Sequence, residues 1–182
     1  MIEIESRARA SACLLVLALC ACAPAAGKQQ AGQTPVSIDS LVLERTACFG
    51  VCPVYRLRIN SAEEIRFESR SRTDSGRVAV DTASAGTYAS IIARARAAGF
   101  YELPSQIEGD PVLCPRSATD FPTVITSIFS GSTTKQVVDD HGCFETIEHK
   151  VPGPLRQLRA LENDIDSTLH SSRWVRPNRP AK

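Results

Sequence analysis

PVYRLRINSAEEIRFES, residues Pro53–Ser69, carries the strongest structural signal in the chain. Residues 55–59 alternate apolar and charged side chains, which is the period-two pattern of a half-buried strand. The same pattern returns at Ile65 and Phe67 after a short turn. Both apolar sets must face one core, so the turn must contain an odd number of residues. This stretch therefore predicts an antiparallel hairpin with one buried and one exposed face.

The turn of this hairpin decides which charged side chains face each other on the exposed side. Asn60–Ala62 is the shortest turn that satisfies the parity, and it would place Arg58 opposite Glu64. Opposite charges on neighbouring strands stabilise a sheet by roughly 0.2–1 kcal/mol. We therefore interpret the exposed arginines as a charge-paired, solvated sheet face and not as a binding patch.

Further strands are expected from short runs of β-branched and alternating residues. These runs cover residues 41–45, 77–80, 123–129 and 134–138. The last two are separated by a glycine-containing turn around Gly131, which is typical of a hairpin.

Two helices are expected from apolar residues that recur with helical spacing. The first begins at an N-cap Ser84 and ends at Gly99, with Phe100 folding back onto its last turn. The second begins near Pro154 and carries a stripe of leucine and isoleucine, while Trp174 covers one end of the core. The order of elements favours an α+β domain: a single antiparallel sheet of about five or six strands with two helices on one face.

The N-terminus resembles an export signal. Residues 12–21 form an apolar run that is too short to span a bilayer, and they follow two arginines. Leu19 lies three residues before Cys22 and Ala21 lies directly before it, so we expect residues 1–21 to be a lipoprotein signal peptide and Cys22 to accept the lipid. Two alternatives remain open: Cys20 as the lipid site, or an ordinary cleavage near residues 23–26 that releases a soluble periplasmic protein.

Composition sets the rest of the domain organisation. The chain has 182 residues, a formal net charge of +1, 43% hydrophobic and 23% charged residues, so it can bury one core and has no excess positive charge for nucleic acid. Residues 22–37 are rich in Ala, Gly, Gln and Pro and are expected to form a flexible tether. A single α+β domain is expected at residues 38–176, followed by a disordered tail at 177–182.

Four cysteines remain after the leader and the lipid site: Cys48, Cys52, Cys114 and Cys143. In an oxidising compartment an even number predicts two disulfides. A local bridge between Cys48 and Cys52 is feasible because Gly50 lets the chain turn back, and Cys114 then pairs with Cys143 by elimination. Two other interpretations are a zinc site of these cysteines with His141, and a redox dithiol in C-F-G-V-C.

No phosphate loop, nucleophile elbow or H-E-x-x-H run is present, so no catalytic residue, metal or cofactor is assigned. A bond between Cys114 and Cys143 would bring Arg116, Asp120 and His141 into one neighbourhood, where a histidine beside carboxylates could act as a base. The alternative is structural: Asp120 caps a turn and pairs with Arg116, while His141 lies on a solvated loop. Together with Tyr55, these three are the possible binding residues.

Several of these stretches resemble an uncharacterised family of exported bacterial domains, known only as a domain of unknown function. The matching pieces are residues 43–45, the C-F-G-x-C-P-x-Y motif at 48–55, residues 97–100, residues 119–123 and the last amphipathic helix. The likeness covers residues from about 40 to 170. The turn at residues 60–63 departs from the glycine-containing turn of the family. The resemblance implies the fold and no activity.

These observations lead to a functional hypothesis. We expect a non-catalytic lipoprotein on the periplasmic side of the bacterial envelope, anchored in the outer membrane by its lipid, that binds an envelope protein, peptide or glycan. The alternative is an envelope enzyme that uses Cys48 and Cys52 for thiol redox chemistry, or Asp120 and His141 for hydrolysis.

Overall fold

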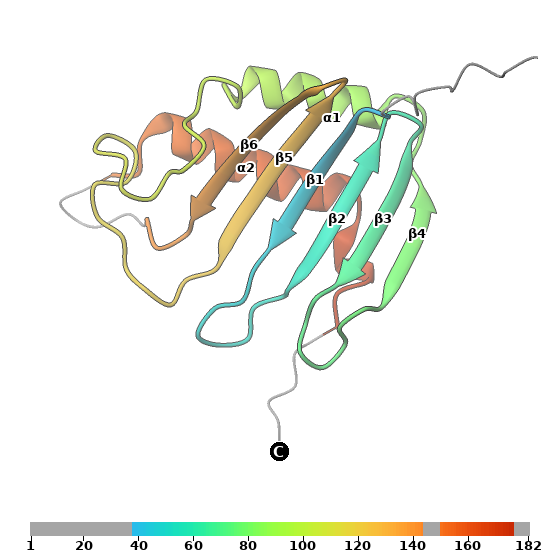
Figure 1. The fold of residues 1–182 in the computed structure, drawn as a ribbon, viewed down its shortest axis with the longest axis horizontal. Helices are drawn as coiled ribbons and strands as arrows, with labels where there is room; N and C mark the ends of the chain where they lie inside the picture. The colour runs from blue at the N-terminus through green and yellow to red at the C-terminus, as the bar shows by residue number, and fades with distance from the viewer. Residues whose placement is uncertain (1–37, 144–149, 177–182) are drawn as a thin grey trace, which may run out of the picture. The chain divides into compact units, whose positions relative to one another are not determined.

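The computed structural model describes residues 38–143 and 150–176 (Figure 1). The expected signal peptide with Cys22, the tether and the C-terminal tail lie outside the described residues. In the described part, no helix is both long and apolar enough to cross a membrane.

Six antiparallel strands form one open sheet in the order β4-β3-β2-β1-β5-β6 (Figure 1). The strands are β1 (Ser40–Arg45), β2 (Tyr55–Asn60), β3 (Glu64–Ser69), β4 (Val78–Thr82), β5 (Thr123–Ser130) and β6 (Thr133–Asp140). The expected alternation is confirmed, since Tyr55, Leu57 and Ile59 are buried together with Ile65 and Phe67. Beyond β6, Gln106 forms a parallel bridge with Val138, so part of this edge is covered.

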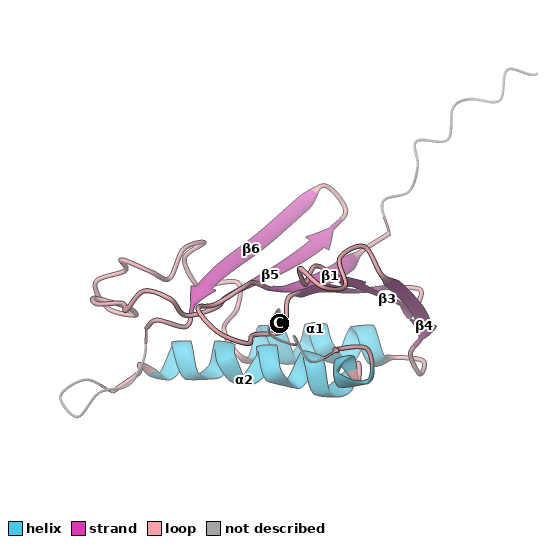
Figure 2. Cartoon of the chain, turned by 90° about the horizontal axis from the view of Figure 1, so that it is seen from below, coloured by secondary structure: helices cyan, strands magenta, loops and turns pink. Residues whose placement is uncertain are grey.

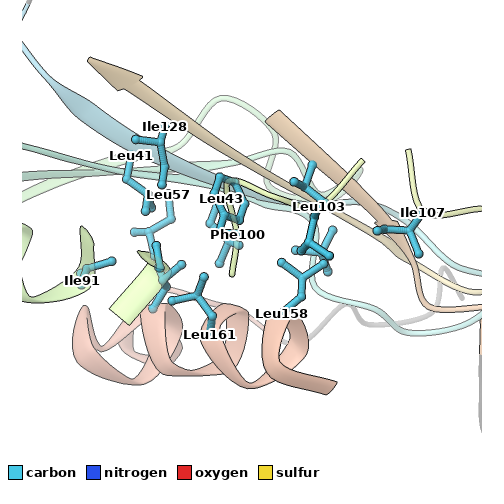
Figure 3. Packing of buried hydrophobic residues seen from close by; sticks show 14 of the residues in the cluster. Leu41, Leu43, Leu57, Ile91, Phe100, Leu103, Ile107, Ile128, Leu158 and Leu161 are labelled. Atoms are coloured by element: carbon cyan, nitrogen blue, oxygen red, sulfur yellow. The ribbon is translucent and has the colours of Figure 1, made fainter. Parts of the chain in front are cut away.

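Two helices pack on one face of the sheet, α1 (Thr87–Ala97) and α2 (Gly153–Thr168), as Figure 2 shows. A short 3-10 helix, η1 (Ser171–Arg173), follows α2. Leu57 from the sheet, Ile91 from α1 and Leu161 from α2 meet in the core (Figure 3). Burial of each such side chain contributes about 1.5–3 kcal/mol. Trp174 packs its ring 5.6 Å from that of Phe67 and covers an end of the core, as expected. The α+β prediction is confirmed.

The turn between β2 and β3 differs from the sequence prediction. It does contain an odd number of residues, but it occupies positions 61–63, so Arg58 lies opposite Arg66 and not opposite Glu64. The side-chain oxygen of Asn60 accepts hydrogen bonds from the backbone N–H groups of Ala62 and Glu64, which fixes this later turn. Local side-chain hydrogen bonds of this kind commonly select the turn.

The start of α1 also differs. Gly86, with a φ of 84°, is the N-cap, and Ser84 lies before it. The carboxylate of Glu63 accepts hydrogen bonds from the N–H groups of Gly86 and Tyr88 at 2.8 and 2.9 Å. A side chain distant in sequence therefore takes the role that we expected of a local serine. The glycine stop is confirmed, since Gly99 has a φ of 70° and Phe100 is fully buried.

Candidate functional site

Arg45, Tyr55 and Asp166 form a polar cluster where the sheet meets α2. Arg45 ends β1 and Tyr55 begins β2, and the register places them directly opposite each other. The hydroxyl of Tyr55 donates a hydrogen bond to Asp166 Oδ1 at 2.6 Å, and Arg45 Nε donates to Oδ2 at 2.7 Å. One carboxylate thus joins the helix to two strands. We call these three residues the Tyr55 cluster.

The electrostatics of this cluster make Tyr55 a hydrogen-bond donor at neutral pH. Burial raises the pKa of the Tyr55 hydroxyl far above its ordinary value of 10.0, and the negative charge of Asp166 raises it further. A phenol that holds its proton this firmly is suited to binding and positioning, and it is a poor general base.

A pocket of about 450 Å³ opens beside the Tyr55 cluster. It combines the polar atoms of the cluster with apolar groups from three segments: the loop before β2, the residue before β5, and the segment after η1. The lining residues are Arg45, Cys52, Pro53, Tyr55, Pro122, Asp166, Ser171, Ser172 and Val175. Stretches that carry the family resemblance, the C-F-G-x-C-P-x-Y motif among them, therefore meet at one concavity.

The loop that leads into this pocket is closed by a disulfide between Cys48 and Cys52, with a Cα–Cα distance of 5.7 Å. Its two large apolar side chains point to solvent: Phe49 is 88% exposed and Val51 is 66% exposed. The N–H of Phe49 donates a hydrogen bond to the carbonyl of Asp120, which places the loop beside the exposed Phe121. We call Phe49, Val51 and Phe121 the disulfide-loop surface.

The second expected disulfide, between Cys114 and Cys143, is also present, with a Cα–Cα distance of 5.4 Å. The two loops that it joins lie side by side, since Ala118 N–H donates to the carbonyl of Gly142 at 3.0 Å. Gly142 is required there, because a Cβ at this position would lie 2.1 Å from the carbonyl oxygen of Ala118. The bridge therefore orders the chain around His141.

Within the described residues, no hydrogen bond or ion pair joins the side chain of His141 to that of Arg116 or Asp120, although the loops that carry them lie side by side. His141 Nε2 lies 3.4 Å from a carboxylate oxygen of Asp139 and 3.4 Å from one of Glu162. Asp120 has a φ of 73°, and its carboxylate accepts a hydrogen bond from the hydroxyl of Thr119 at 3.5 Å. Among residues 38–143 and 150–176, no ion pair joins Arg116 to Asp120. The partners of His141 come from β6 and α2 instead.

Sequence reasoning missed Glu162 and Asp166, and with them Arg159, which binds Asp139. These three polar residues recur along α2 with the spacing i, i+3, i+7, so they share one side of the helix. This spacing, beside the leucine and isoleucine stripe of the same helix, is the feature from which they could have been predicted. The pattern indicates a charged edge on α2 but does not reveal its partners, which come from strands far away in the sequence.

Residues 39–168 match the family described as a domain of unknown function, DUF6438. The chain belongs to this family. The DUF6438 match includes the Tyr55 cluster, the first disulfide loop, His141 and Glu162, and it ends before Ser171. A search of curated proteins gives no match.

The site in the DUF6438 domain has the chemistry of recognition. It offers hydrogen-bond donors and acceptors in a pocket next to exposed apolar side chains, and a covalent bond limits the motion of the loop that carries them. The four cysteines that we expected to be structural are paired in two disulfides. Cys48 and Cys52 lie in a loop between two strands, whereas the reactive cysteine of a dithiol enzyme commonly stands at a helix N-terminus.

Proposed function

We propose that this DUF6438 protein is an exported, lipid-anchored and non-catalytic domain that binds a peptide segment of another envelope protein. The segment lies across the disulfide-loop surface and inserts a side chain into the pocket beside the Tyr55 cluster. Asp166 and Arg45 line that pocket and can accept or donate hydrogen bonds to the segment.

The exposure of Phe49 and Val51 on a covalently closed loop is the observation that carries this proposal. Exposed aromatic and aliphatic groups next to a concavity are typical of interaction sites, where a few such residues supply most of the binding energy. A loop of five residues held by a disulfide also loses little conformational entropy when it binds. The surface is therefore suited to a partner that covers apolar side chains.

The proposed location has separate support. The resemblance of residues 1–21 to an export signal and the two disulfides both fit an exported protein, since disulfides persist outside the reducing cytoplasm. Labelling of expressing cells with a radioactive fatty acid tests the anchor. We expect label in the wild type and in Cys20→Ser, and none in Cys22→Ser. Label in Cys22→Ser would overturn the assignment.

The binding proposal is tested by selecting random peptides displayed on phage against the purified protein, with its disulfides intact. Selected peptides should bind the double variant Phe49→Ser, Val51→Ser at least about tenfold more weakly than the wild type. Val112→Ser is the matched control, because Val112 is 70% exposed and lies outside this surface. Both variants should keep the thermal stability of the wild type, since exposed positions contribute little to it.

Two results would contradict the binding proposal. Peptides that bind the wild type and the double variant equally well would show that another surface is used. A selection that enriches no peptide would remove the binding role for this surface.

A further inference from the structure

A second polar cluster lies between the end of β6 and α2, away from the proposed peptide site. Asp139 is on β6, His141 follows this strand directly, and Glu162 is on α2. Asp139 and Glu162 are buried, whereas His141 is 25% exposed in its side chain. One donor atom from each residue lies within 4.8 Å of the others. We call these residues the His141 cluster.

The distances in this cluster suit a shared cation better than direct hydrogen bonds. His141 Nε2 lies 3.4 Å from Asp139 Oδ2 and 3.4 Å from Glu162 Oε2, whereas a good N–H···O bond is about 2.7–3.2 Å long. Ligand atoms that surround zinc tetrahedrally at 2.0–2.1 Å stand about 3.4 Å apart. The two separations from His141 therefore match edges of a tetrahedral coordination shell, and the oxygens of Asp139 and Glu162 lie within 4.8 Å of each other.

Glu162 gives an independent indication that the cluster lacks a partner. Its Oε1 atom is buried and has no hydrogen-bond partner in the described structure, although the residue is only 1% exposed. A buried carboxylate oxygen without a partner is costly. The ionised carboxylate is thus short of positive charge.

The charges of the neighbouring groups lead to the same conclusion. Arg159 donates to Asp139 from Nε at 2.8 Å and from Nη2 at 3.1 Å, and it neutralises one carboxylate. Two carboxylates and one guanidinium leave one negative charge when His141 is neutral. Each oxygen of Asp139 retains a lone pair, so Arg159 orients this ligand as outer-shell groups do in metal sites.

The backbone around His141 holds the cluster in place. His141 N–H donates to the carbonyl of Pro122 at 3.1 Å, and Gly142 N–H donates to Asp140 Oδ1 at 2.7 Å. The disulfide at Cys143 follows two residues later. The ligands are therefore pre-positioned, which reduces the entropy lost on binding an ion.

We propose that the His141 cluster binds one divalent transition-metal ion, with Zn²⁺ as the fitting chemistry, through Asp139, His141 and Glu162. An imidazole with two carboxylates is a donor set that zinc accepts. The ion enters on the side of His141, and its fourth ligand is a water molecule or the second oxygen of Glu162.

The test uses the full chain, purified in detergent with its disulfides oxidised and other thiols blocked, after treatment with EDTA. Titration calorimetry with ZnCl₂ should show one ion bound per chain, and ZnCl₂ should raise the Tm by several degrees. Glu162→Gln and His141→Gln should each weaken zinc binding at least about tenfold. His170→Asn is the matched control, because it removes an exposed histidine and keeps a residue that accepts the φ of 52° at this position.

Glu162→Gln removes a buried charge without changing the size of the side chain, so this variant should fold normally and its zinc affinity can be measured. The proposal is overturned if the wild type binds no zinc. It is also overturned if both cluster variants bind zinc as tightly as the wild type, since the ion would then be held elsewhere. Loss of zinc binding in His170→Asn alone would place the site at that histidine and overturn it equally.

Discussion

The Tyr55 cluster and the His141 cluster are built by the same side of α2, yet they differ in how well their polar atoms are satisfied. Asp166 accepts two hydrogen bonds shorter than 2.8 Å, one on each oxygen. Glu162 has one contact at 3.4 Å, and its other oxygen has no partner. A carboxylate with both oxygens bonded is suited to hold a helix on a sheet. One with a bare buried oxygen is suited to receive a ligand.

Each cluster has a disulfide beside it, and the two disulfides should differ in their effect on stability. Cys114 and Cys143 are 29 residues apart, whereas Cys48 and Cys52 are four apart. In the chain-entropy description, the longer loop stabilises by about 3.5 kcal/mol and the shorter by about 2 kcal/mol. The double variant Cys114→Ser, Cys143→Ser should therefore lose more free energy of unfolding in urea than Cys48→Ser, Cys52→Ser.

Zinc titration of the same two variants measures whether each disulfide supports the cluster beside it. Loss of the Cys114–Cys143 bond should weaken zinc binding, because it loosens the chain next to His141, and loss of the Cys48–Cys52 bond should leave it unchanged. Equal losses of stability, or zinc affinities that change together, would mean that the clusters are not independently supported.

Asp166 should be the most important single side chain of the Tyr55 cluster for stability. Asp166→Ala leaves a largely buried Arg45 without its ion-pair partner, with only the side-chain oxygen of Asn163 at 3.2 Å, and removes the acceptor of Tyr55. We therefore expect a loss of about 3 kcal/mol in urea unfolding. Asp164→Ala is the control on the same helix. Its carboxylate is 57% exposed and lies 3.4 Å from Arg94, so its loss should cost less than about 1 kcal/mol. Similar costs would contradict the structural role of Asp166.

Removing the charge of Glu162, unlike removing that of Asp166, should stabilise the protein when no metal is bound. Because the folded protein raises the pKa of Glu162, the native state holds this proton more firmly than the unfolded chain, and stability falls as pH rises above 4.5. Glu162→Gln should therefore be modestly more stable than the wild type at pH 7 in EDTA. The difference should vanish below pH 4.5, where both side chains are neutral. Urea unfolding at pH 7 and pH 4 measures this, and a destabilised variant at pH 7 would contradict it.

Prediction from sequence succeeded where the signal was local. The alternation in β2 and β3 identified their buried faces, and the Gly99 stop identified the end of α1. It failed at the β2–β3 turn and at the start of α1. At the turn, hydrogen bonds to the side chain of Asn60 select positions 61–63, which the parity of the buried faces does not distinguish from 60–62. At the helix, Glu63 lies more than twenty residues before the N–H groups that it caps.

The candidate sites were only partly predictable for a related reason. Tyr55, His141 and the two disulfides could be identified from a motif and from cysteine arithmetic, whereas Asp120 and Arg116 were grouped with His141 only through the expected bond between Cys114 and Cys143. The contact of His141 with Glu162 exists only because α2 lies next to the end of β6.

Periodicity, glycine stops and the parity of buried side chains were enough to establish an antiparallel sheet under two helices, since each depends on residues within one turn or one hairpin. The fold alone placed Asp166 between Arg45 and Tyr55, and Glu162 beside His141. Such pairs join residues about 20 to 120 positions apart, and the energy of their contacts exists only after the hydrophobic core has brought α2 onto the sheet.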